Sequence, residues 1–121
     1  MTDVKDLLIK TLSFVFPDYQ VYLQGSLSDS DGYDEAFFTF WNNYANDASF
    51  YDNAETQTIW SFDVNFYATD PLLVNTVLLE AKKALKAVGF IPDGSGHDVA
   101  SDEDTHTGRG LTVLFLQKVR L

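Results

Sequence analysis

The stretch "TQTIWSFDVNFYATDPLLVNTVLLEAKKALKAVGF", residues 56–90, contains a strand pattern followed directly by a helix pattern. In its first part, large apolar residues alternate with polar ones: Trp60, Phe62, Val64 and Phe66 against Ser61, Asp63 and Asn65. Because successive side chains of a strand point to opposite faces, this alternation predicts an antiparallel strand over 56–68 with one buried face.

The second part of the stretch predicts a long helix. Asp70 is a good N-cap residue, and Pro71 at the first helical position loses no hydrogen bond. Gly89 suits the left-handed conformation that ends many helices. Between them, apolar residues recur at helical spacing and predict one buried stripe: Val74, Val77, Leu78, Ala81, Leu85 and Val88.

Working outward, the flanking sequence predicts one more helix and further strands. Residues 3–16 predict a helix with an apolar stripe of Val4, Leu7, Leu8, Leu12 and Val15, ended by Pro17. We expect strands over 19–25, 36–44 and 110–121, a loop over 26–35, and a loop or hairpin region over 45–55. Residues 89–110 are expected to be mostly loop, with a short strand near 90–91 or 97–99.

The resulting order α-β-β-β-α-β-β predicts an α+β fold. We expect a mostly antiparallel sheet of four to five strands, with two helices packed on one face. At 121 residues the chain fits one domain, 1–121.

Composition excludes several function classes. The net charge is −10, and no Lys or Arg occurs between Lys10 and Lys82, which disfavours binding to nucleic acid phosphates. There is no cysteine, so disulfides and thiolate metal sites are excluded. The sequence lacks a nucleotide-binding glycine motif, a basic signal-peptide start and a run of apolar residues long enough for a membrane span. We therefore expect a soluble protein with no cofactor and no membrane partner.

Residues 36–53, "AFFTFWNNYANDASFYDN", hold seven aromatic rings. Two helices cover only one side of a sheet, so rings on both faces of residues 37–41 exceed what one core accommodates. Aromatic residues are enriched at protein contacts. We expect an interface that includes part of this segment and the last strand: Phe38, Phe40, Trp41, Phe50, Tyr51, Leu114, Leu116 and Arg109.

The segment 97–110 contains both histidines, His97 and His106, among several carboxylates. Such a group is compatible with a divalent metal or with acid–base chemistry. A turn whose charges are satisfied locally, with Arg109 paired to nearby acids or to those of a neighbouring copy, is the interpretation we favour. No catalytic or metal-binding residue is therefore assigned.

Five segments resemble small proteins of tailed phages and prophages of Gram-positive hosts: "FPDYQVYLQGS", "FFTFWNN", "WSFDVNFYATDP", "LLEAKKALKAVGF" and "THTGRG". The likeness is to the tail-completion group, also called tail terminators or tail-to-head joining proteins. It implies a non-enzymatic subunit of a hexameric ring that caps the tail tube and meets the head-completion protein. It also implies assembly in the host cytoplasm and a final location at the head–tail junction of the virion.

A ring that passes DNA needs a lumen that repels phosphate, and carboxylates supply that repulsion. The hypothesis for the channel lining is drawn from two acidic segments: Asp29, Asp31, Asp34, Glu35, Asp102, Glu103 and Asp104. The alternative function is an acidic inhibitor that mimics DNA and blocks a host nucleic-acid enzyme.

Overall fold

The computed structural model describes residues 3–23, 34–49, 55–101 and 105–120. The elements follow in the order α1 (Val4–Val15), β1 (Gln20–Leu23), β2 (Ala36–Ser49), β3 (Glu55–Ala68), α2 (Pro71–Ala87), β4 (Ile91–Val99) and β5 (Thr107–Arg120). This order and the α+β class confirm the prediction.

The five strands form one sheet in the order β1-β2-β3-β5-β4. Three strand pairs are antiparallel, whereas β1 pairs parallel to β2, so the sheet is mixed. A parallel pair needs a connection of about a dozen residues to return to the same end of the sheet. Residues 24–35 separate β1 from β2 and provide that length.

Both helices begin and end where local chemistry directs them. Asp3 accepts a hydrogen bond from the backbone N–H of Asp6, and Asp70 accepts one from that of Leu72. After α2, Gly89 takes a φ of +107°, and the backbone N–H of Phe90 donates to the carbonyl of Leu85. This Schellman-type end confirms the role predicted for Gly89.

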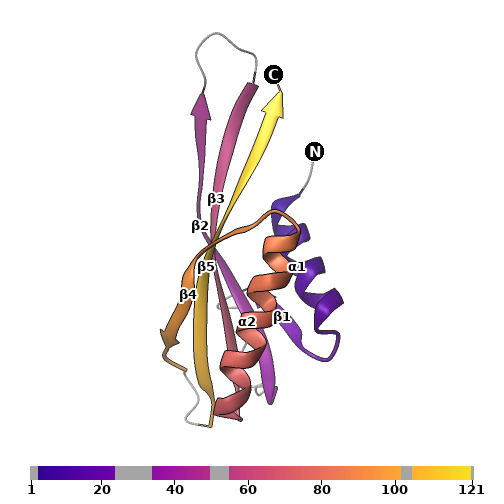
Figure 1. Ribbon diagram of the computed structural model, residues 1–121, viewed down its shortest axis with the longest axis vertical. Helices are drawn as coiled ribbons and strands as arrows, with labels where there is room; N and C mark the ends of the chain where they lie inside the picture. The colour runs from indigo at the N-terminus through magenta and orange to yellow at the C-terminus, as the bar shows by residue number, and fades with distance from the viewer. Residues whose placement is uncertain (1–2, 24–33, 50–54, 102–104, 121) are drawn as a thin grey trace.

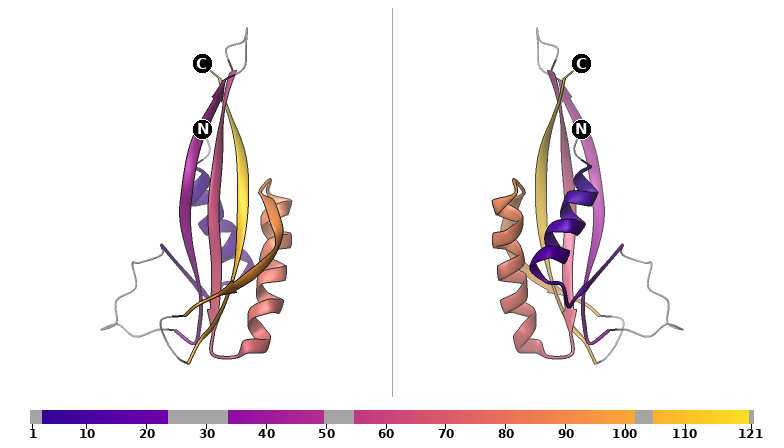
Figure 2. Two further views of the ribbon diagram at one scale, coloured as in Figure 1. Left: turned by 90° about the vertical axis from the view of Figure 1, so that its left-hand side faces the viewer. Right: turned by 90° about the vertical axis from the view of Figure 1, so that its right-hand side faces the viewer.

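The core lies between one face of the sheet and the two helices (Figures 1 and 2). Leu8 and Leu12 of α1 and Leu85 of α2 are fully buried there, against Phe38, Phe62 and Phe66 of the sheet. Burying large side chains of this kind supplies most of the free energy of folding. At the end of this core, the Trp60 ring stacks near Phe62, and its indole N–H donates to the Gln117 side chain at 3.1 Å.

The three central strands continue beyond the helices (Figure 1). We call this extension the arm: residues 44–49 of β2, 55–61 of β3 and 115–120 of β5. Of the loop or hairpin region predicted over 45–55, the structure has the hairpin, because β2 runs to Ser49 and pairs antiparallel with β3, which begins at Glu55. For 89–110 the mostly loop prediction is wrong, since β4 runs over nine residues, but the short strand predicted near 97–99 is confirmed by the pairing of β4 with β5 there.

Within the described ranges, no helix is long and apolar enough to cross a membrane.

Candidate assembly surface

The sheet face away from the helices carries an exposed apolar surface that we call the open-face patch. Its members come from four strands: Trp41, Tyr44, Ile59, Ile91, Leu114 and Leu116. Cross-strand pairs place Leu116 opposite Ile59 and Leu114 opposite Ile91, whereas Ser61 lies between Tyr44 and Leu114. The exposed fractions of Trp41, Ile91 and Leu116 are 48%, 47% and 43%. Contiguous apolar surface of this kind is typical of contact sites.

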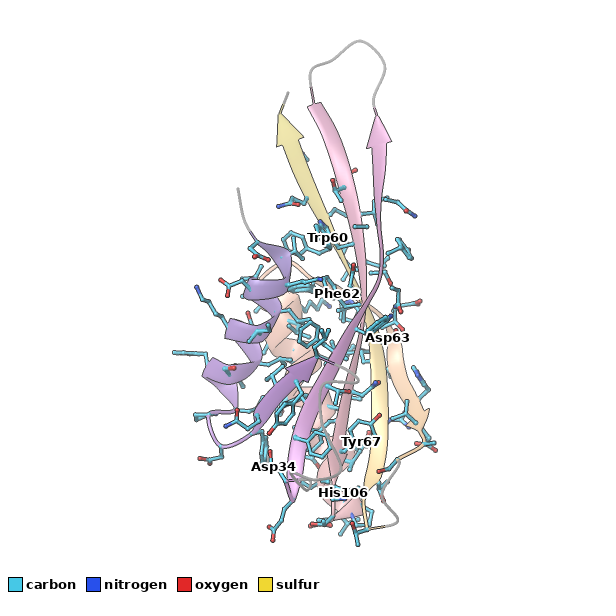
Figure 3. All side chains as sticks on the ribbon, turned by 180° about the vertical axis from the view of Figure 1, so that it is seen from behind. Asp34, Trp60, Phe62, Asp63, Tyr67 and His106 are labelled. Carbon is cyan, nitrogen blue, oxygen red and sulfur yellow. The ribbon has the colours of Figure 1, made fainter. Side chains whose placement is uncertain are left out.

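A polar network fixes the centre of the open face. The Asp63 carboxylate accepts hydrogen bonds from the Asn43 amide at 3.0 Å and from the Thr112 hydroxyl at 2.9 Å. Asn43 also donates to the Ser61 hydroxyl. Phe62 and Asp63 point to opposite sides of β3 (Figure 3), so this network is separate from the core. It holds β2, β3 and β5 in one register below the arm.

At the end of the sheet opposite the arm, aromatic side chains form a second cluster on the open face. The Phe37 ring stacks on Tyr67 at 5.4 Å between centroids and contacts His106 at 5.8 Å. His106 Nε2 lies 2.7 Å from the backbone oxygen of Asp34. A carbonyl can only accept, so Nε2 carries the hydrogen. Asp34, Tyr67 and His106 gather at this end in Figure 3.

The same end is acidic. Carboxylates of Asp18, Asp34, Glu35 and Asp70 surround a hollow of about 510 Å³, and none of its described lining residues is basic. The Asp34 carboxylate accepts a hydrogen bond from the Tyr22 hydroxyl at 2.9 Å. Asp34 and Glu35 are both exposed, and a channel-lining role for them stays a prediction. The other members of that hypothesis lie outside the described residues: Asp29, Asp31, Asp102, Glu103 and Asp104.

Apart from Arg109, the predicted interface residues fall into three groups. Phe38 and Phe40 were expected at an interface, but they are only 0% and 4% exposed in the core. That assignment is wrong for both, because the register pairs Phe38 with Phe66 and turns these side chains toward the helices. Trp41, Leu114 and Leu116 lie in the open-face patch. Phe50 and Tyr51 lie outside the described residues.

Arg109 is held within its own chain. Its guanidinium lies 2.9 Å from the Asp98 carboxylate and donates to the backbone oxygen of Gly96 at 3.2 Å. Of the two pairings considered for Arg109, the structure has the local one. This ion pair links β5 to β4, and an interface role for Arg109 stays a prediction.

The two histidines do not share a site. His97 is exposed on β4 opposite Gly110, whereas His106 contacts Phe37 and Asp34. Among residues that the structure describes, no three His, Cys, Asp or Glu side chains are arranged to hold a metal ion.

The helix layer carries a second apolar surface that the sequence patterns missed. Val15 and Val88, both expected in buried stripes, are each 41% exposed and line a groove between α1 and α2. Phe14, 87% exposed, lines it as well. At this groove, hydrogen bonding to Asp6 raises the pKa of Lys10 above its ordinary value.

Neither the known family models nor the curated proteins contain a match to this chain.

Proposed function

We propose that this protein is a structural subunit of a tailed phage or prophage. In this role it forms a ring at the head–tail junction, terminates the tail tube and joins it to the head-completion protein. The observation that carries the proposal is the open-face patch, a broad apolar surface on a chain whose core is already closed by two helices. The sequence likeness to tail-completion proteins supplies the biological setting.

Two features of the fold support an assembly role. The arm extends three strands past the helix layer, so it offers two faces to neighbours. The opposite end concentrates exposed carboxylates around Asp34 and Glu35. Acidic surface repels DNA phosphates, so DNA passes such an end without being held.

Disruption of the gene in its phage tests the proposal. We expect full heads and complete tails that remain unjoined in electron micrographs, and restoration of joined particles by the wild-type gene supplied in trans. Joined, infectious particles without the protein would overturn the proposal. Binding of the purified chain to a host nuclease or polymerase would instead favour the DNA-mimic alternative.

A further inference from the structure

We infer that the two free edges of the arm pair with each other between copies, so that β5 of one copy continues into β2 of the next. This inference rests on the proposed assembly function and names the surfaces through which copies meet. The partner in this contact is a second copy of the chain, and the copies are arranged head to tail.

The first observation is that both edges are free at the same height. β1 pairs with β2 only over Phe37–Phe40, and β4 pairs with β5 only as far as Leu114. Past those points, no other strand in the described part of the chain covers either edge. Residues 44–49 of β2 pair with 56–61 of β3, and residues 115–120 of β5 pair with 55–60 of β3. Residues 55–61 of β3 are therefore flanked on one side by six residues of β2 and on the other by six residues of β5, and the outer edges of both segments are free of other described strands.

The second observation is that both edges are regular. The irregularity in β2 falls between Asn42 and Tyr44, in the part of the uncovered edge next to β1, and residues 44–49 beyond it pair regularly with β3. The Asn42 amide donates to the backbone oxygens of Tyr44 and Ser61, at 3.1 and 3.0 Å, which stabilises the bulge. Proteins usually protect edges with bulges, charged side chains or very short strands, and residues 44–49 and 115–120 are each six residues long and contain no bulge. Unpaired N–H and C=O groups in such a row can pair with another strand.

The third observation is how the open-face patch divides between the edges. Trp41 and Tyr44 lie on the β2 side, and Leu116 and Ile91 lie on the β5 and β4 side. Sideways continuation of the sheet places the apolar residues of one copy next to those of the next on a single face. A contact between a β5 edge and a β2 edge makes Tyr44 of one copy a same-face neighbour of Leu116 of the next, whereas a two-fold contact through β2 alone gives Leu116 no such neighbour.

Charge favours the same arrangement. In sequence, the β5 edge "FLQKVR", residues 115–120, has two basic residues and no acid, whereas the β2 edge "YANDAS", residues 44–49, has one acid and no base. Two β5 edges facing each other bring like charges together, which destabilises a strand pair. A β5 edge facing a β2 edge avoids that repulsion. Both strands run antiparallel to β3, so this contact is a parallel strand pair in copies that share one orientation.

Cysteine cross-linking of the full chain tests the contact cleanly, because the natural sequence has no cysteine. The variants Asn46→Cys on β2 and Lys118→Cys on β5 both substitute exposed residues of the arm. Differently tagged preparations are mixed at high concentration and treated with a short bis-maleimide. We expect the mixed Asn46→Cys/Lys118→Cys product to predominate over either homodimer. Asn75→Cys on the exposed surface of α2 is the matched control, and it should link to neither.

Predominant homodimers, or no mixed product, would overturn the edge contact. A chain that forms multimers by light scattering without the mixed cross-link would overturn it too, while leaving the assembly role standing. Joined particles from the disrupted phage would overturn the assembly role itself. As a second variant, Leu116→Lys on the background of Lys118→Cys should reduce the mixed product about tenfold or more, because the contact would bury an unpaired charge. An unchanged yield would count against the proposal.

Discussion

The same three strands behave differently in the two halves of the sheet. Beside the helices, β2, β3 and β5 bury Phe38, Phe62 and Val113 completely. In the arm, Trp60 and Phe115 still pack against the end of the core on the helix side, whereas Tyr44 and Leu116 on the open face are more than two-fifths exposed. One half of each strand is committed to the fold, and the other half is available for a partner. The three strands stay paired with one another along their whole length. The two halves therefore differ in what covers the strands and not in how the strands pair.

The largest expected effect in this comparison belongs to the covered half. Phe38→Ala removes a fully buried ring that packs on Phe66 at 4.7 Å and on Phe16 at 5.3 Å. Phe-to-Ala changes in closed cores cost about 3–5 kcal/mol. We expect a loss of that size in the free energy of unfolding, measured by urea denaturation. A loss below about 1 kcal/mol would mean that this half is not the core.

The covered half was also the more predictable half. The alternation around Trp60–Phe66 and the caps at Asp70 and Gly89 are local signals, and they predicted β3 and α2 closely. Residues 45–49, "ANDAS", contain Asn and Asp, which are poor strand formers, and show no apolar alternation. They form a strand because β3 pairs with them in register, and no local pattern reports such pairing.

The candidate site was predictable only in part, for a similar reason. With apolar residues on both faces of 37–41, the sequence could not assign which face meets the helices. The pairing of Phe38 with Phe66 and of Trp41 with Asp63 makes that assignment. The groove at Val15 and Val88 was missed because helical periodicity ignores where a neighbouring helix stops covering the stripe.

The next largest effect is expected at the aromatic end of the open face. A Cβ added at Gly108 would lie 2.6 Å from the Tyr67 ring and 2.8 Å from a Val99 methyl. Gly-to-Ala in a strand ordinarily stabilises slightly, but this clash reverses the sign. We expect Gly108→Ala to lose about 1–3 kcal/mol in the free energy of unfolding. Thr107→Ala, at an exposed neighbouring position, is the control and should change little. Equal stability of the two variants would contradict the close packing of Tyr67.

A smaller effect is expected at the junction between the halves. Asp63→Ala leaves Asn43 and Thr112 without their shared acceptor, at a cost of about 1–3 kcal/mol, with the lower end expected for a half-exposed group. Asp63→Asn retains a carbonyl acceptor and should cost less. Hydrogen exchange of the arm amides should increase in Asp63→Ala if the network holds the three strands in register. Unchanged exchange would show that the arm is held by its own pairing alone.

The smallest effect on stability, and the largest on association, is expected from Tyr44→Ser in the arm. Tyr44 is 41% exposed, and its ring faces the open side, so the unfolding free energy should change by about 0.5 kcal/mol or less. The mixed cross-link between β2 and β5 should nevertheless fall severalfold, because an apolar member of the contact is lost. Phe14→Ser is the matched control: it also replaces an exposed ring by Ser, but on the helix side. Light scattering should show weaker multimers for Tyr44→Ser and unchanged multimers for Phe14→Ser. Weaker multimers for Phe14→Ser and unchanged multimers for Tyr44→Ser would place the contact at the groove between α1 and α2. That result would show that the arm is not the part of the sheet that contacts a second copy.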